Sequence, residues 1–314
     1  MLPLVSAIVP VHNRAWCIRR SIESVLAQDY RPLELIVVDD GSTDDTPRLL
    51  GEIAREMTEH PESKAGGIAL RKSKAGGIAL RKSKAGGIAL RILRQDNRGV
   101  SAARNLGIRA ARGPLIALLD SDDEWLPQKT SRQAACFPAH PGMRVHQTGE
   151  TWVRKGRRVN PPLRLRKKAG DLFEQSLDHC AISPSAVMLR REVFDEVGLF
   201  DESFPACEDY EMWLRITCRH EVGLLDEALI VKHGGHEDQL SFTVEALDRQ
   251  RIRAIVKTLD SGVLSAAQRD LAVRALETKC RIYAQGCRKR GREDEAKEVL
   301  DLVRRCAGAS SHQN

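Results

Sequence analysis

Three carboxylates stand within four residues at positions 120–123. Asp120, Asp122 and Asp123 flank Ser121 and follow the apolar run 115–119. Carboxylates this close repel one another unless a cation lies among them. Carboxylate and phosphate oxygens are the usual ligands of Mg²⁺ and Mn²⁺, and such a metal neutralises charge on a departing nucleotide diphosphate. The alternative is that these residues only cap the helix that follows.

A pair of acidic residues, Asp39-Asp40, follows the predicted strand 33–38 and precedes Gly41. A carboxylate at the end of a strand, before a turn-forming glycine, can accept hydrogen bonds from a base or a ribose. The alternative is a simple turn with a helix cap, because Asp44 and Asp45 stand before the helical segment 46–57.

Another acidic pair, Glu208-Asp209, begins a segment with apolar residues at helical positions. The helix dipole stabilises acidic residues in a first turn. A carboxylate here could deprotonate an acceptor hydroxyl. Helix capping alone is again the alternative.

Alternating strands and helices must position the first two clusters. We predict strands at 5–9, 33–38, 88–93 and 115–119, and helices that begin near 18, 46 and 101. Short apolar strands separated by helices indicate an α/β fold, with a mainly parallel sheet flanked by helices. Ligands bind such sheets at the carboxyl ends of the strands, where both acidic clusters lie.

The second half of the chain is less regular and ends in helices. We predict a strand at 186–189, helices at 191–197 and 210–220, and a C-terminal helical appendage with helices at 244–259, 265–289 and 293–305. The last two should pair, with Leu271, Leu276, Ile282 and Tyr283 facing Ala296, Val299, Leu300 and Val303. The predicted organisation is a main domain at 1–243, a helical region at 244–306 and a flexible tail at 307–314.

A perfect tandem repeat interrupts the main domain. Lys-Ala-Gly-Gly-Ile-Ala-Leu-Arg occurs at 64–71, 74–81 and 84–91. One copy can make a short strand but cannot bury a core alone, so we interpret 64–91 as an expansion inside a surface loop, where insertion costs little. The strand at 88–93 would borrow the last copy. A basic arm that contacts an acceptor or a membrane is the alternative.

The net charge of +7 is concentrated in two places. Residues 64–91 and 154–168 each hold eight Lys or Arg and no acid, and aromatic residues make up 4% of the chain. This distribution argues against a nucleic-acid partner. It favours solvated loops, with contact to an anionic membrane as the alternative. The sequence has no apolar run of about 20 residues, no secretory signal and no metal-like cysteine spacing, so we expect a cytoplasmic protein, peripheral at the inner face of the cell membrane if the basic segments contact lipid.

Five motifs, spread over residues 3–242, together resemble family 2 of the inverting glycosyltransferases, which have the GT-A fold. In order they are Ile8-Val9-Pro10-Val11-His12-Asn13, Asp39-Asp40-Gly41-Ser42-Thr43-Asp44, Asn97-Arg98-Gly99-Val100-Ser101-Ala102-Ala103-Arg104-Asn105, Asp120-Ser121-Asp122-Asp123 and Glu208-Asp209. The processive members of this family carry transmembrane helices and a Gln-any-any-Arg-Trp motif, which are absent from this sequence. The resemblance therefore implies a soluble enzyme that transfers one sugar at a time.

The resemblance also implies roles for individual residues. Asp209 would be the catalytic base, with Glu208 beside it, and Asp122 would bind Mn²⁺ or Mg²⁺, with Asp123 as the rival ligand. Asp120 would contact the ribose or act as a second metal ligand, and His236 could touch the metal or the diphosphate, or have no such role. The nucleotide would be bound by Pro10, Val11, Asn13 and Asp40, supported by Asp39, and by Gly99, Ser101, Arg104 and Asn105 near the base and diphosphate.

The implied reaction moves a sugar from a nucleotide-diphosphate sugar, with UDP favoured, to a hydroxyl of a glycan, a lipid-linked or another acceptor. Cell-surface polysaccharide, lipopolysaccharide or glycoconjugate synthesis is the expected setting. A sugar-phosphate nucleotidyltransferase is one alternative, but Asn13-Arg14 is not followed by the Gly-rich loop that such enzymes use. A non-catalytic binding or scaffold protein is the other, and it would be expected to have lost the carboxylates.

Overall fold

The computed structural model describes residues 2–59, 70–72, 78–80, 87–235 and 247–308. The chain divides into two compact units. The first comprises Met1–Gly170, Ile182–Ser203 and Glu221–His236, and the second Asp171–Ala181, Phe204–His220 and Glu237–Asn314. Two segments that precede residue 243 thus belong to the same unit as the C-terminal helices. A packing unit need not coincide with a family domain, so the boundary at 243 stays a prediction.

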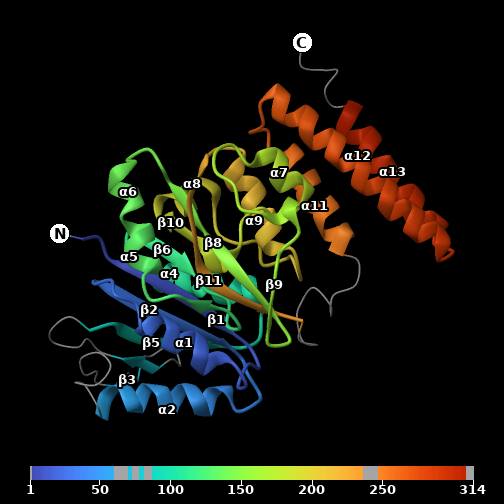
Figure 1. The fold of residues 1–314 in the computed structure, drawn as a ribbon. Helices are drawn as coiled ribbons and strands as arrows, with labels where there is room; N and C mark the ends of the chain where they lie inside the picture. Colours follow the sequence, from blue (N-terminus) through green and yellow to red (C-terminus); the bar gives the residue numbers. More distant parts are fainter. Residues whose placement is uncertain (1, 60–69, 73–77, 81–86, 236–246, 309–314) are drawn as a thin grey trace. The chain divides into compact units, whose positions relative to one another are not determined.

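A nine-stranded sheet forms the centre of the first unit (Figure 1). Its order is β5 (Ala89–Gln95), β2 (Leu33–Asp40), β1 (Val5–Val11), β6 (Leu115–Leu118), β10 (Val187–Arg190), β8 (Val145–Arg154), β11 (Val222–Gly234) and β7 (Glu124–Trp125), with β9 (Arg157–Val159) paired to β8. The predicted strands of the first half pair in parallel, which confirms the α/β fold class. Strand β10 joins antiparallel to β6 and β8.

Strands β1 and β2 are buried along their whole length, which explains why most of their residues are apolar. The buried polar groups Ser6 and Glu34 pair with each other, because the Ser6 hydroxyl donates to the Glu34 carboxylate at 2.6 Å. One face of the sheet packs against α1 (Ile18–Leu26) and α2 (Thr46–Glu59) in a common core. On the other face, Gly107 of α4 (Val100–Ala110) lies so close to Ile8 and Val38 that a Cβ at this position would clash. The helices thus cover both faces of the sheet, and the candidate site lies at the ends of its strands.

The third copy of the repeat supplies β5, as predicted. Leu90 pairs with Leu35 of β2, in parallel. The first two copies contribute β3 (Leu70–Lys72) and β4 (Ile78–Leu80), which pair antiparallel with each other. The rest of the repeat lies outside the described residues.

Several elements of the second half were not predicted. They are β7, β8, β9 and β11, the short helices α5 (Lys129–Ala134), α6 (Cys136–Ala139) and α7 (Phe173–Asp178), and two 3₁₀ turns, η1 (Leu163–Leu165) and η2 (Pro184–Ala186). The predicted strand at 186–189 and helix at 191–197 correspond to β10 and α8 (Glu192–Val197). Strands β8 and β11 mix buried and half-exposed residues with polar ones, so they lack an apolar run.

The second unit is helical. It contains α7, α9 (Glu208–Thr217), α11 (Leu247–Asp260), α12 (Ala266–Lys289) and α13 (Glu293–Gly308), around one apolar core. A capping box fixes the start of α12, because the Ser265 hydroxyl accepts from the Gln268 N–H at 3.2 Å and the Gln268 side chain accepts from the Ser265 N–H at 3.0 Å.

The predicted pairing of α12 with α13 is confirmed by their shared core. Leu276, Tyr283, Ala296 and Val299 are buried in it, and Leu271, Leu300 and Val303 pack against it. Ile282 was wrongly assigned to this face. It is 56% exposed, because it is rotated by about 100° from Tyr283 around the helix. No helix within the described ranges is long and apolar enough to span a bilayer.

Candidate active site

The carboxyl ends of β1 and β2 are joined through Asn13. Its backbone takes the left-handed conformation, with φ of 51°, which asparagine tolerates better than most residues. The Asn13 N–H donates to the Ser42 hydroxyl at 2.9 Å, and its Oδ1 accepts from the Thr43 N–H at 2.8 Å. Asn13 therefore fixes the turn that follows Asp40.

The Asp40 carboxylate ties β2 to the start of α4. Oδ1 accepts from the Gln95 amide at 2.7 Å and from the Arg98 N–H at 2.9 Å, and Oδ2 accepts from the Gly99 N–H at 2.8 Å. Gly99 has φ of 90°, a conformation that side-chain-bearing residues rarely adopt. Since both oxygens of Asp40 have protein donors, this carboxylate shapes the loop before α4, and its contact with a nucleoside stays a prediction.

Asp39 lies at the same corner, and its support of a nucleoside pocket stays a prediction. It is 2% exposed, accepts from the Ser42 N–H at 2.9 Å and lies 3.5 Å from the Arg94 guanidinium.

His12 joins three of the sequence motifs, although we had assigned it no role. Its Nδ1 lies 2.8 Å from the Asp40 carbonyl oxygen, so it must carry the proton and donate. Its Nε2 is then an acceptor, 3.2 Å from the side-chain amide nitrogens of both Asn13 and Asn97. The sequence signal for a role of His12 is its position: it follows the strand that ends at Val11 and stands between two residues of the first motif, Val11 and Asn13.

Two buried residues of α4 point to different partners. Arg104 donates to Asp120 Oδ1 at 2.7 Å and lies over the Phe200 ring, 5.2 Å from its centroid. The Asn105 amide exchanges hydrogen bonds of 2.8 and 2.9 Å with the backbone of Phe200 and donates to Glu202 at 3.0 Å. Arg104 therefore belongs to the acidic cluster, whereas Asn105 holds the 200–202 loop.

Ser101 is the third residue of interest on α4. Its hydroxyl is buried and has no hydrogen-bond partner within the described part of the chain. It is thus an unused polar group one residue into a helix that begins at the strand ends.

The carboxylate of Asp123 is held by the protein. It is 1% exposed, and its two oxygens accept from the Ser185 hydroxyl at 2.6 Å and the His233 N–H at 3.0 Å. Burial, followed by the neighbouring charges of Asp122 and Asp120, raises the pKa of Asp123 well above its usual range, although Lys232 and Ser185 oppose this. A hydrogen-bonded, buried carboxylate is poorly available to a metal.

Helix α1 holds the backbone of the acidic loop. The Ser21 hydroxyl lies 2.6 Å from the Ser121 carbonyl and 2.7 Å from that of Asp123, and Arg20 donates to the Asp122 carbonyl at 3.0 Å. The loop is therefore fixed independently of its carboxylates. The side chains of Asp120 and Asp122 remain partly exposed.

The acidic loop fits a hard divalent cation in its donor chemistry. Asp122 offers a partly exposed carboxylate, and Asp120 is 27% exposed beside Arg104. No group of three His, Cys, Asp or Glu side chains converges among the described residues, so phosphate oxygens would have to complete the shell. His236 lies outside the described residues. His233 is engaged elsewhere, since its Nε2 lies 2.6 Å from Glu124 Oε1.

In the second unit, Glu208 and Asp209 begin α9, directly after Cys207, whose φ is 60°. Glu208 is 5% exposed, whereas Asp209 is half-buried. The Asp209 oxygens accept from the Tyr210 N–H at 2.7 Å and from the Cys180 thiol at 3.1 Å. These two donors orient the carboxylate.

Cys207 is no nucleophile in this environment. Burial, and then the adjacent Asp209, raises the pKa of its thiol to about 12. The thiolate, which is the reactive form, is therefore disfavoured.

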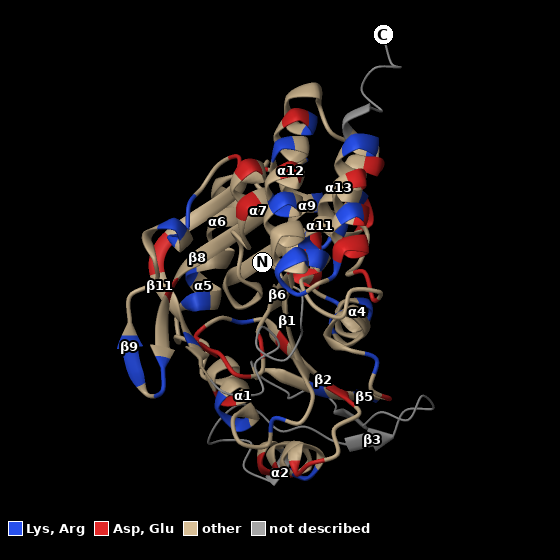
Figure 2. Cartoon of the chain, turned by 90° about the vertical axis from the view of Figure 1, so that its right-hand side faces the viewer, with Lys and Arg blue, Asp and Glu red and all other residues tan. Residues whose placement is uncertain are grey.

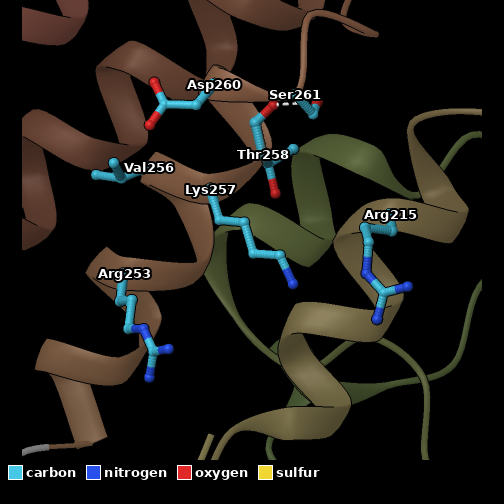
Figure 3. A pocket seen from close by; sticks show the side chains of 7 residues that line it. All are labelled: Arg215, Arg253, Val256, Lys257, Thr258, Asp260 and Ser261. Carbon is cyan, nitrogen blue, oxygen red and sulfur yellow. Dashed lines mark hydrogen bonds between the residues drawn. The ribbon is translucent and has the colours of Figure 1, made fainter. Parts of the chain in front are cut away.

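A buried ion-pair network lies one turn further along α9. Glu211, with its side chain 1% exposed, pairs with Arg215 through both oxygens at 2.7 Å and with Lys257 of α11 at 2.7 Å. Figure 3 shows Lys257 between Arg253 and Arg215, at a cavity that these residues line with Val256, Thr258, Asp260 and Ser261. The network couples the helix that carries the acidic pair to α11.

We expect Glu211→Gln to lower the free energy of unfolding by about 3 kcal/mol, because it leaves the largely buried Arg215 guanidinium without its carboxylate and removes the partner of the half-exposed Lys257. Urea denaturation checks this. Glu298→Gln, at an exposed position on α13, is the control and should change stability by less than about 0.5 kcal/mol. Equal midpoints for the two variants would contradict a stabilising role for the network.

The fold and the sequence both have known counterparts. The structure resembles S. aureus TarS 1–349 in complex with UDP-GlcNAc, a GT-A-like structure, with a TM-score of 0.61 and 15% identity. The match covers 96% of this chain and 91% of that chain. Residues 6–198 match the family described as glycosyl transferase family 2. The chain thus belongs to glycosyl transferase family 2.

Named relatives agree with this assignment. A chain called "uncharacterized glycosyltransferase" from Rickettsia felis is 30% identical over 226 residues, which are 72% of this chain and 32% of that protein. The Escherichia coli UDP-Glc:alpha-D-GlcNAc-diphosphoundecaprenol beta-1,3-glucosyltransferase WfaP is 28% identical over 69% of this chain and 72% of its own length. This chain thus spans about a third of the Rickettsia relative and most of the second.

Proposed function

We propose that this chain is an inverting glycosyltransferase that transfers a sugar from a UDP-linked donor to an acceptor hydroxyl. The observation that carries the proposal is the acidic loop 120–123, which follows the central strand β6 and is framed by Arg104, Ser185 and α1. A fixed loop with partly exposed carboxylates suits a diphosphate that is bound together with a cation.

The donor would lie at the carboxyl ends of the parallel strands. In this proposal Asp122 holds Mn²⁺ or Mg²⁺, with Asp123 as the less accessible rival. The bound ion would neutralise charge on the diphosphate. Arg104 and Asp120 would orient the ribose and diphosphate through the ion pair that they form. The nucleoside pocket would be lined by Pro10, Val11, Asn13, Asp40, Gly99, Ser101 and Asn105, with Asp39 and His12 as supports.

The acceptor would be activated by Asp209. Its carboxylate takes the proton of the acceptor hydroxyl while that oxygen bonds to the anomeric carbon and the bond from this carbon to the diphosphate breaks. Attack opposite the leaving group inverts the configuration. The two donors on the Asp209 oxygens support this role, because they hold the carboxylate in one orientation. Glu208 would assist from its buried position.

The acceptor class follows from chemistry and from one relative. The name of WfaP says that it glucosylates a sugar on a lipid diphosphate. We propose a glycan or lipid-linked acceptor of this kind, used in cell-surface polysaccharide or lipopolysaccharide synthesis. The enzyme would then act in the cytoplasm, at the inner face of the cell membrane.

A screen of nucleotide sugars tests the donor proposal. We expect UDP-sugars to bind in the presence of Mn²⁺, with binding at least about tenfold weaker after chelation, because the ion offsets diphosphate charge. Calorimetric titration of UDP-, GDP- and dTDP-sugars provides the measurement. A matched assay for pyrophosphate from a sugar phosphate and a nucleoside triphosphate should stay negative. Failure of every nucleotide sugar to bind with metal present would refute the proposal.

A further inference from the structure

One stretch of the first unit is strongly basic and carries an exposed leucine. We call residues 154–168 the basic hairpin; they contain eight Lys or Arg and no acid. Figure 2 shows basic residues along β9. Lys167 is half-buried and lies 3.8 Å from the buried Glu150. The other seven are exposed: Arg154, Lys155, Arg157, Arg158, Arg164, Arg166 and Lys168.

The basic hairpin has a defined backbone. Arg154 of β8 pairs with Arg157 of β9 across the two residues Lys155 and Gly156, which have φ of 49° and 73°. Two consecutive positive φ values are typical of the type I′ turn, which matches the twist of a two-stranded ribbon. The cations at the tip are thus held together on a structured element.

Leu163 adds an apolar group to this surface. It is 88% exposed, more than the other exposed large apolar side chains of the described residues. It begins the 3₁₀ turn η1, directly after Pro161 and Pro162. The segment is anchored beyond it, because the Gln147 side chain donates to the Lys168 carbonyl at 3.0 Å. The leucine is therefore presented by a fixed turn with basic residues on either side in the chain.

The charge of the surface is little offset by acids nearby. Arg166 lies 4.0 Å from Asp226, and both side chains are about three-quarters exposed, so this pair is weak. Exposed cations attract anionic lipid head groups, and an exposed leucine can enter the boundary of the acyl chains. A nucleic acid would use the same cations but would gain nothing from the leucine. The combination therefore favours a membrane.

We propose that the basic hairpin docks the enzyme on an anionic lipid surface, with Leu163 inserted. The basic hairpin would thus hold the enzyme at the inner face of the membrane. The benefit of this position, access to a lipid-linked acceptor, rests on the proposed function. Lipid binding itself requires no sugar transfer, so the two proposals can fail separately.

Co-sedimentation of the full chain with vesicles tests the proposal. We expect binding to phosphatidylcholine vesicles that contain phosphatidylglycerol, no binding to phosphatidylcholine alone, and release at about 1 M salt, where charges are screened within about 3 Å. The triple variant Arg157→Gln, Arg158→Gln, Arg164→Gln should bind roughly 100-fold more weakly, since each charge near the surface contributes about fivefold. Leu163→Ser should lose about tenfold.

The control removes the same charge elsewhere in the first unit. Arg55→Gln, Arg109→Gln, Arg112→Gln changes three exposed arginines and should bind vesicles like the wild type. Equal losses in the two triple variants would overturn the proposal in favour of net charge. An unchanged Leu163→Ser, or displacement of the protein from vesicles by double-stranded DNA, would overturn it as well. Binding of UDP-sugars by all variants would show that the donor site is intact.

Discussion

Asp209→Asn is expected to abolish sugar transfer, with kcat lowered by about 100- to 10,000-fold, while the UDP-sugar still binds. A general base supplies acceleration of this order, and the amide cannot take the proton of the acceptor hydroxyl. The amide is nearly isosteric with the carboxylate, so α9 should persist. Transfer to an acceptor and calorimetric titration of the donor, both with Mn²⁺, measure the two effects.

The control for Asp209→Asn is Asp294→Asn. Asp294 occupies the first turn of α13, as Asp209 occupies that of α9, but it is exposed and belongs to no motif of the proposed site. Both changes remove a favourable charge from a helix start, which is worth at most about 1 kcal/mol at an exposed site. If the two variants lose activity equally, Asp209 only caps its helix. If Asp209→Asn also loses the donor, its role lies in binding.

The parallel half of the sheet could be predicted from the sequence because its strands are buried on both faces. An eight-residue strand such as Leu33–Asp40 has no exposed position, so its interior, residues 35–38, leaves a continuous apolar signal. Strand β11 gave no such signal. Its 13 residues alternate irregularly between buried and half-exposed, with register shifts between Leu225 and Ile230. Burial of such a strand depends on partners distant in the chain.

The sequence nominates residues for the site, and their roles in it stay predictions. Asp39 and Asp40 end β2 and Asp120 follows β6, as predicted. The side chains of Asp40, Asn13 and Asn105, however, are engaged by protein groups. Sequence shows that a polar group stands at a strand end. It does not show which backbone N–H groups will reach it, because these come from loops whose path depends on tertiary packing. For the same reason the sequence left Asp122 and Asp123 as rivals.

The roles of Asp122 and Asp123 should be distinguished when each residue is changed to asparagine. We expect Asp122→Asn to lower Mn²⁺-dependent activity by at least about 100-fold, because a neutral amide is a poorer ligand for a hard cation. Its stability should change by less than about 0.5 kcal/mol, since Asp122 is partly exposed. Asp123→Asn should instead lower the free energy of unfolding by about 1–3 kcal/mol. The His233 N–H is a fixed donor, so the amide oxygen must face it and the N–H₂ must face the Ser185 hydroxyl. This hydroxyl, which already accepts from the Asp120 N–H, would then have to change from donor to acceptor in a buried site.

Ser185→Ala provides the matched control for the structural role. It removes one donor to Asp123 but leaves all the carboxylates, so it should lower stability by about 1 kcal/mol and keep the response to Mn²⁺. Urea denaturation and activity across a Mn²⁺ titration distinguish the variants. If Asp123→Asn requires far more Mn²⁺ while Asp122→Asn does not, Asp123 is the ligand, and its bonds to Ser185 and His233 must then rearrange when metal and donor bind. If neither variant changes the requirement for Mn²⁺, the acidic loop is not the metal site. Its carboxylates would then act on the donor only through Arg104 and the backbone that α1 holds.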